Sequence, residues 1–166
     1  MTAAYVAGGW TDFGATIAAT AATMVGLLFV AVSINLQRIL KFPHLPSRAA
    51  QTLILFVTPL LVGILLLAPG QSRAALAVEL LVTGVLVGAC QLVIHARTPR
   101  SEAETRLTRL VGRVLPPIVS CGSLAIAGCT LLAQAGGGLY WLLPSVLAAI
   151  IFGLLNAWVL LVEILR

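Results

Sequence analysis

The sequence predicts an all-α fold: a polytopic transmembrane helical bundle of five spans that forms one domain over residues 1–166. Two observations lead to this class. The chain is 60% hydrophobic and only 9% charged, whereas a soluble domain carries roughly 25% charged residues. Its mean hydropathy is +1.10, and its apolar blocks can cross a bilayer core about 30 Å thick as helices of roughly 20 residues. We therefore expect a multi-pass protein of the cell membrane.

The first two spans are separated by a proline-containing connection. The first is predicted over about 14–40, with Thr11 or Asp12 as the residue that caps the helix. The second is predicted over about 48–67, because the two prolines of the KFPHLPS segment prevent a continuous helix. Its side chains are almost all Leu, Val and Ile, so we expect this helix at the lipid-facing periphery of the bundle.

The third span is predicted over about 72–95, after the tight turn APGQS, with Ser72 as its cap. Gly84 and Gly88 are four residues apart and lie on one face of this helix, while Glu79 and Thr83 lie nearly opposite. Both faces favour contacts with protein, so we expect the third helix to be buried between neighbours.

The last two spans are divided only by glycines. The fourth is predicted over about 107–134, with Pro116 and Pro117 bending it in its first third. The GGG triplet of QAGGG ends it, and the fifth span is predicted over about 139–165. No charged residue lies between Arg113 and Glu163, so the glycines alone divide this stretch into two spans.

The distribution of charge predicts the orientation. Positive residues on one side of the predicted bundle are Arg38, Lys41, Arg48, Arg97, Arg100, Arg106, Arg109, Arg113 and Arg166, whereas the other side has Arg73 alone. By the positive-inside rule, the N-terminus is outside and the C-terminus is cytoplasmic. Aromatic residues, which favour membrane interfaces, cluster at the predicted outer side: Tyr5, Trp10, Phe13, Tyr140 and Trp141.

Glu79 is an acid inside an apolar run. At the centre of a membrane such a residue costs roughly 2.5–3.5 kcal/mol on insertion scales, so its presence needs an explanation. One hypothesis is structural: a hydrogen bond to Thr16 or Thr20 of the first span. The other is functional: a cation site or a proton-titrating group near the outer mouth, with Thr83 one turn deeper. Both stay open.

Small and polar residues follow three other helices at helical spacing. In membranes such residues mark close helix contacts. The first span carries Ala19, Thr23, Gly26, Val30, Ser33 and Gln37. The fourth carries Ser120, Ser123, Ala127, Thr130 and Gln134, and the fifth carries Ser145, Ala149, Gly153 and Asn156. These stripes are either packing seams or, for the first and fourth spans, the lining of an aqueous path. Because five helices leave little room inside one subunit, we expect such a path between copies.

A second polar group is predicted toward the cytoplasmic side. Its members are Asn35, Gln91, His95, Arg113, Asn156 and Glu163. Arg113 and Glu163 are a natural pair near the interface. The group forms either a structural network or an inner gate.

Sequence motifs for catalysis and cofactors are absent. The chain contains no Walker loop, HExxH, GxSxG or paired cysteines, so we expect neither an enzyme nor a metal or cofactor. The basic residues are not interleaved with aromatics, so we expect no nucleic-acid partner. The expected partners are the lipid bilayer and further copies of the chain. We expect a small homo-oligomeric channel or carrier for an ion or small solute. The alternative is a non-transporting accessory or scaffold subunit that binds another membrane protein.

Overall fold

The computed structural model describes residues 3–97 and 114–165, with side chains described over 4–97 and 114–162. This part of the chain is helical, and five of its helices are long and apolar enough to cross a membrane. They are α1 (Thr11–Ile34), α3 (Leu45–Leu67), α4 (Arg73–Arg97), α6 (Leu115–Ala133) and α7 (Leu142–Leu165). The short elements are η1 (Ala3–Tyr5), η2 (Ala7–Trp10), α2 (Leu36–Ile39) and η4 (Gly138–Trp141). The predicted all-α class is confirmed, and five helices that could span a membrane by length and composition correspond to the five predicted spans.

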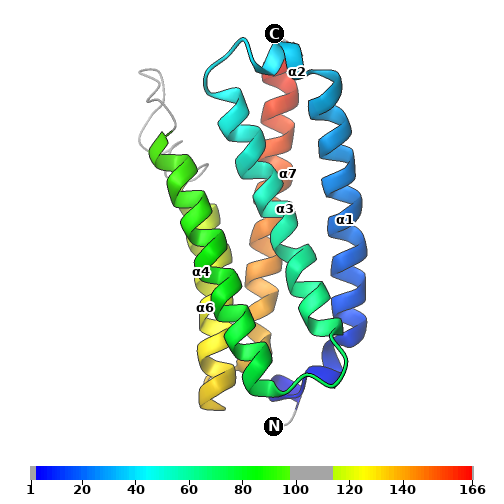
Figure 1. The fold of residues 1–166 in the computed structure, drawn as a ribbon, viewed down its shortest axis with the longest axis vertical. Helices are drawn as coiled ribbons and strands as arrows, with labels where there is room; N and C mark the ends of the chain where they lie inside the picture. Colours follow the sequence, from blue (N-terminus) through cyan, green and yellow to red (C-terminus); the bar gives the residue numbers. More distant parts are fainter. Residues whose placement is uncertain (1–2, 98–113, 166) are drawn as a thin grey trace.

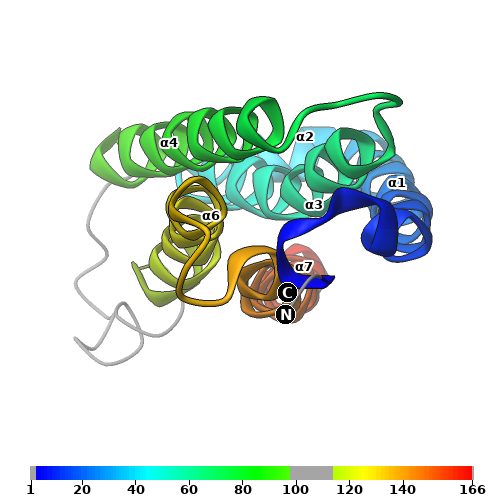
Figure 2. The ribbon, with the colours of Figure 1, turned by 90° about the horizontal axis from the view of Figure 1, so that it is seen from below.

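The long helices form two layers. Helices α4, α3 and α1 lie side by side in one layer, and α6 and α7 form the second (Figures 1 and 2). The chain begins at the end of the bundle where α3 turns into α4, here called the N-terminal end, and finishes beside α2 at the opposite, C-terminal end (Figure 1). Helix α3 therefore separates α1 from α4.

The predicted peripheral position of the second span is wrong, because α3 is the central helix and packs against α1, α4 and α7. Thr52 and Thr58 are 0% and 1% exposed. A Cβ atom at Gly63 would lie 2.5 Å from the carbonyl oxygen of Gly14 and 2.8 Å from Cβ of Ala18. Lipid acyl chains are as apolar as leucine, so a Leu-rich helix surface gains no more from contact with another helix than from contact with lipid. The few small and polar residues of this helix mark its contacts.

Helix α4 lies at the edge of its layer, so the prediction that it is buried between neighbours holds only in part. One side packs on α6: a Cβ at Gly84 would lie 3.3 Å from the backbone nitrogen of Ala125, and one at Gly88 would lie 3.6 Å from Cβ of Cys121. A second side packs on α3. The remaining side exposes bulky apolar residues: Val78, Val82, Val85, Leu86, Leu92 and Val93.

Helix α1 differs from the first predicted span at both ends. It begins at Thr11, and its N-cap is Trp10, which makes no capping hydrogen bond with its side chain. The predicted cap at Thr11 or Asp12 is therefore wrong; the Thr11 hydroxyl instead donates to the carbonyl of Gly8 at 3.4 Å. At its other end α1 stops at Ile34. Asn35 interrupts the helix, and α2 follows as a separate turn.

The predicted cap of the third span is confirmed. The Ser72 hydroxyl accepts a hydrogen bond from the backbone N–H of Ala75 at 3.1 Å, which satisfies an amide of the first turn of α4. The preceding helix α3 begins at Leu45, three residues before the predicted start, with proline in its first turn, where a missing N–H costs no helix bond.

The glycine break between the last two spans is also confirmed. Helix α6 ends at Ala133, and Gln134 takes a left-handed conformation with φ of 55°. Gly137 continues the turn with φ of 108°, a value that side chains with a Cβ rarely adopt. Pro116 and Pro117 lie in the first turn of the described part of α6. Positions 107–113 of the predicted span, and hence the bend expected within it, lie outside the described residues.

Candidate functional site

One face of α1 points away from the rest of the subunit. It extends the predicted first-span stripe toward the N-terminus by two residues at the same spacing of three and four, Asp12 and Thr16. We call it the α1 outer face. Its members on α1 are Asp12, Thr16, Ala19, Thr23, Gly26, Val30 and Ser33, and Gln37 of α2, the last residue of the predicted stripe, is counted with them. Every member is exposed. The predicted path residues Thr23, Ser33 and Gln37 therefore make no packing seam inside the subunit.

The N-terminal half of this helix has an unusual surface for a helix in lipid. From Thr11 to Gly26, each exposed side chain belongs to Thr, Asp, Ala or Gly. The exposed side of α4, by contrast, includes six bulky Val and Leu side chains. Small residues let helix backbones approach closely, and polar residues are rare where a helix meets only acyl chains. This half of the α1 outer face has the composition of a helix–helix contact.

The threonine hydroxyls of α1 are bonded to their own helix. Thr16 donates to the carbonyl of Asp12 at 2.8 Å, Thr20 donates to that of Thr16 at 2.8 Å, and Thr23 donates to that of Ala19 at 2.9 Å. Such bonds satisfy the hydroxyl proton without a second helix. Each oxygen retains acceptor capacity on the exposed side, so the face is polar yet compatible with a membrane.

The fourth-span stripe is packed inside the subunit over its first three residues, whereas Thr130 is half-buried and Gln134 is exposed. Ser120, Ser123 and Ala127 are buried, and the Ser145 hydroxyl of α7 donates to the backbone carbonyl of Ser120 at 2.7 Å. The Ser120 hydroxyl itself has no hydrogen-bond partner among the described residues. Further along, the Thr130 hydroxyl donates to the carbonyl of its own helix at Ile126. In the subunit this stripe is a seam between α6 and its neighbours.

Glu79 contacts the α3–α4 turn. The side-chain amide of Gln71 donates a hydrogen bond to its carboxylate. The threonines expected as partners, Thr16 and Thr20, bond to the α1 backbone instead, and α3 lies between them and α4 (Figure 2). Thr83, one turn deeper, is half-buried. Glu79 is therefore remote from the α1 outer face.

A small polar pocket lies at the N-terminal end. It has a volume of about 230 Å³ and is lined by residues that include Tyr5, Gln71 and Arg73. The side-chain amide of Gln134 lies against the Arg73 guanidinium, and the amide orientation that satisfies both groups turns the oxygen toward Arg73. The Tyr5 hydroxyl accepts a hydrogen bond from the backbone N–H of Gly137 at 3.3 Å. Gln134, the last residue of the fourth-span stripe, therefore lies beside this polar pocket.

The predicted inner polar group is brought together only in part. Gln91, 3% exposed, donates to the backbone carbonyl of Gln51 on α3 at 3.3 Å. Asn156 is buried on α7. Asn35 instead donates to the carbonyl of its own helix at Ala31, at 2.9 Å. His95 is half-buried, and its Nδ1 has no hydrogen-bond partner among the described residues.

The other two members of that group are Arg113 and Glu163. Arg113 and the side chain of Glu163 lie outside the described residues, so their pairing stays a prediction. Buried Gln51 and Thr52 of α3 were missed by the sequence reasoning, although two adjacent polar residues in an apolar span are a visible signal.

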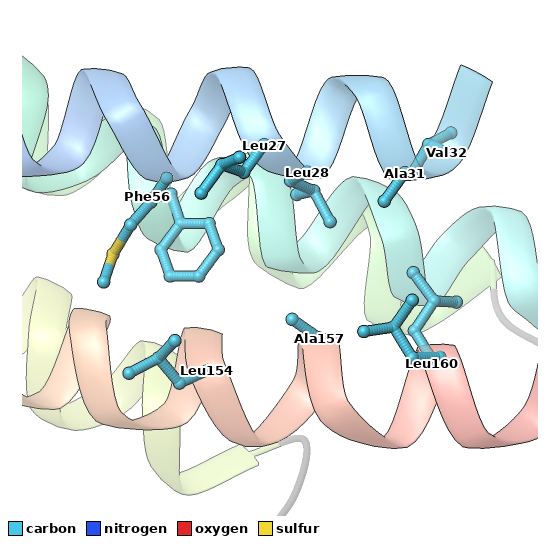
Figure 3. A pocket seen from close by; sticks show the side chains of 10 residues that line it. Leu27, Leu28, Ala31, Val32, Phe56, Leu154, Ala157 and Leu160 are labelled. Atoms are coloured by element: carbon cyan, nitrogen blue, oxygen red, sulfur yellow. The ribbon is translucent and has the colours of Figure 1, made fainter. Parts of the chain in front are cut away.

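An apolar groove opens between α1 and α7. Its volume is about 160 Å³, and side chains of the two helices face each other across it with Phe56 of α3 at one side (Figure 3). The Phe56 ring occupies the space that a Cβ at Gly153 would need. The lining residues are hydrocarbon or thioether in character, so this groove offers no route for an ion.

Within the described ranges, no three His, Cys, Asp or Glu side chains are grouped closely enough to hold a metal ion. Comparisons with protein-family models, with curated proteins and with solved structures found no match.

Proposed function

We propose that the chain is a small homo-oligomeric membrane channel or carrier in which copies meet along the α1 outer face. The observation that carries this proposal is the exposed surface of α1 between Thr11 and Gly26, made of Thr, Asp, Ala and Gly alone. A route for an ion or small solute then runs between α1 helices of neighbouring copies. Asp12 stands at its mouth, and Thr16, Thr23, Ser33 and Gln37 follow along it.

The packing inside one subunit supports a route between copies. Ser120, Ser123 and Ala127 of the α6 stripe are buried in the subunit, and the groove between α1 and α7 is apolar. A hydrated ion needs polar groups or water along its whole path. The stripe on α1 leaves all of its polar residues, Thr23, Ser33 and Gln37, exposed, whereas the α6 stripe exposes only Gln134 fully.

We further propose that the N-terminus is outside and the C-terminus cytoplasmic. Four described cations, Arg38, Lys41, Arg48 and Arg97, belong to the C-terminal end, while Arg73 begins α4 at the opposite end. Trp10 makes edge-on contacts with Phe13 and Tyr140, with ring centroids 5.5 and 5.2 Å apart. Such aromatic groups favour a membrane interface. The test is labelling from outside of a single cysteine at Ala135 or at Pro43, in a variant without native cysteines: we expect labelling at Ala135 only.

The transport proposal is tested in liposomes that contain the purified chain. Flux of monovalent cations, anions and protons is compared between the natural chain and the variants Asp12→Asn and Thr23→Val, which change the face without adding bulk. We expect flux from the natural chain and a reduction of at least several-fold in the variants. Val82→Ile on the lipid-facing side of α4 is the matched control and should conduct normally. Equal flux in all four proteins contradicts the assignment to α1.

A second candidate is an accessory or scaffold subunit whose α1 outer face binds a different membrane protein. The observation in its favour is that the α1 threonines already bond to their own backbone, as expected of a surface built for packing alone. Absence of flux, with a different membrane protein purifying in constant ratio with the chain and lost in Gly26→Leu, supports this second candidate.

A further inference from the structure

A second apolar pocket lies at the C-terminal end, where α1 and α3 are joined through α2. Its volume is about 280 Å³. Leu28, Ile39 and Ala49 form its floor and are 6%, 1% and 8% exposed. One residue comes from each of α1, α2 and α3, so the pocket exists only because Asn35 ends α1 and lets α2 fold across this end.

The rim of the pocket faces the surroundings of the subunit. Phe29, Leu36 and Leu40 border it and are 66%, 48% and 66% exposed. These rim residues are bulky and apolar, unlike the exposed residues in the first half of α1. A helix with its side chains is about 10–12 Å across, too wide for this space, whereas a single acyl chain can enter it.

Positively charged residues lie close in sequence to the residues that line this pocket. The connection that carries its rim holds Arg38, Lys41 and Arg48, and no acid occurs between Asp12 and Glu79. Lys41 is exposed and directly follows the rim residue Leu40. A phosphate group held here would meet only cations along this stretch of the chain.

We propose that this pocket binds one acyl chain of an anionic phospholipid, with the lipid phosphate at Lys41. The apolar floor and rim supply the site for the chain, and the cations of the connection supply the preference for a negative headgroup. Each Lys or Arg near a membrane surface attracts anionic lipid by about 1 kcal/mol, which is roughly a fivefold preference. This proposal is independent of whether the chain conducts.

The test uses phosphatidylglycerol and phosphatidylcholine that carry the same photoactivatable acyl chain. Each is incorporated with the purified protein in mixed vesicles, and the cross-linked residues are mapped by mass spectrometry. We expect phosphatidylglycerol to label the segment 28–53 several-fold more than phosphatidylcholine does. Lys41→Gln should lower the phosphatidylglycerol signal about fivefold, the effect of one charge. Ala50→Phe, which fills the pocket, should lower the labelling by both lipids.

Matched controls separate this site from other sources of labelling. Ala157→Phe fills the groove between α1 and α7, and Arg73→Gln removes a cation at the opposite end. Both should leave the labelling of residues 36–53 unchanged, because none of these residues lines that groove. An excess of soluble glycerophosphate should not compete, because it lacks the acyl chain. Equal labelling by the two lipids, or an unchanged signal in Lys41→Gln, overturns the proposal even if Ala50→Phe fails to fold.

Discussion

Single glycines set the distance between helices in this bundle. Gly63 faces the Gly14 carbonyl of α1, and a Cβ atom at Gly128 would lie 2.7 Å from the Ala77 carbonyl of α4. Real Cβ atoms are not found so close to a carbonyl oxygen, so these helices approach each other only because the side chain is missing. In a lipid environment the close approach supplies the dispersion contacts that hold the helices together.

The first prediction concerns Gly63. We expect Gly63→Ala to push α1 away from α3 and to lower the free energy of unfolding by about 1–3 kcal/mol, the usual cost of overpacking. Unfolding in mixed detergent, followed by tryptophan fluorescence, measures the change. Gly122→Ala is the matched control, because a Cβ atom at that position would have nothing within 4 Å. Equal stability of the two variants would mean that α1 and α3 do not pack as described.

The second prediction concerns Glu79, whose contact with Gln71 supports the structural hypothesis. Glu79→Gln keeps an oxygen that can accept the Gln71 hydrogen bond, so we expect little change in stability or in flux. Glu79→Leu removes the acceptor and should lower the free energy of unfolding by about 1 kcal/mol. The same unfolding assay and the liposome assay measure both. Normal stability with abolished flux in Glu79→Gln would instead favour a working role in transport.

For single residues, the sequence identified the unusual polar positions better than it predicted the hydrogen-bond partners of those residues. Ser72 was identifiable as a cap because the signal is local. The partner of Glu79 was not identifiable, since it depends on which helices are neighbours. Gln71 was close in sequence, yet it lies in a turn whose path is fixed only when α3 and α4 are placed.

The helices differ in whether their small residues are buried or exposed. Buried small residues serve packing within the subunit, and exposed ones are available for contact with another molecule. Helix α7 packs through Ser145, Ala149 and Gly153, which are all buried, against α6 and α3. The small-xxx-small ladder predicted for the fifth span is therefore used within the subunit. The comparable pattern on the first half of α1 meets no other described helix, although its residue types are similar.

The third prediction belongs to the α6–α7 contact. Ser145 is 0% exposed, and its hydroxyl donates to the Ser120 carbonyl. Ser145→Ala should cost about 0.6–2 kcal/mol, the range of interhelical hydrogen bonds in membranes. Cys90→Ala removes an exposed thiol of α4 and is the control, with an expected change close to zero. A similar loss in both variants would contradict a specific role for the Ser145 bond.

Some element boundaries were predictable because they follow local chemistry. The glycine triplet after Gln134 ends α6, and prolines precede and open α3, whereas the two ends of α1 carry no comparable signal. The position of α3 was not predictable in the same way. Hydrophobicity predicts that a helix lies in the membrane, but it does not predict whether the helix is central or peripheral in the bundle. The residues of α3 that indicate a central position are few: Thr52, Thr58 and Gly63.

At the scale of the whole molecule, the two layers leave α1 at one edge with α3 as its main neighbour. A helix at an edge has a side available to another molecule. Here that side begins with Asp12 and continues with threonine, alanine and glycine as far as Gly26. The proposed assembly of copies follows from this position, and the sequence could not establish it because exposure depends on the packing of all five helices.

The fourth prediction tests the assembly. A Cβ at Gly26 has nothing within 4 Å in the subunit, so Gly26→Leu should fold normally. The added bulk would keep the α1 helices of two copies apart, and we expect monomers where the natural chain associates. Energy transfer between differently labelled copies in liposomes measures association. Val82→Ile is the control, and undiminished transfer in Gly26→Leu would place the contact elsewhere.

The opening segment of the chain is tied to the last hairpin. Tyr5 bonds to the turn at Gly137, the Trp10 ring contacts Tyr140, and a side chain at Gly138 would collide with the carbonyl of Ala4. The ribosome synthesises Tyr5 long before Gly137, its partner 132 residues further along the chain. These contacts therefore cannot form early in synthesis, and this end of the bundle is held together only after the turn between α6 and α7 has been made.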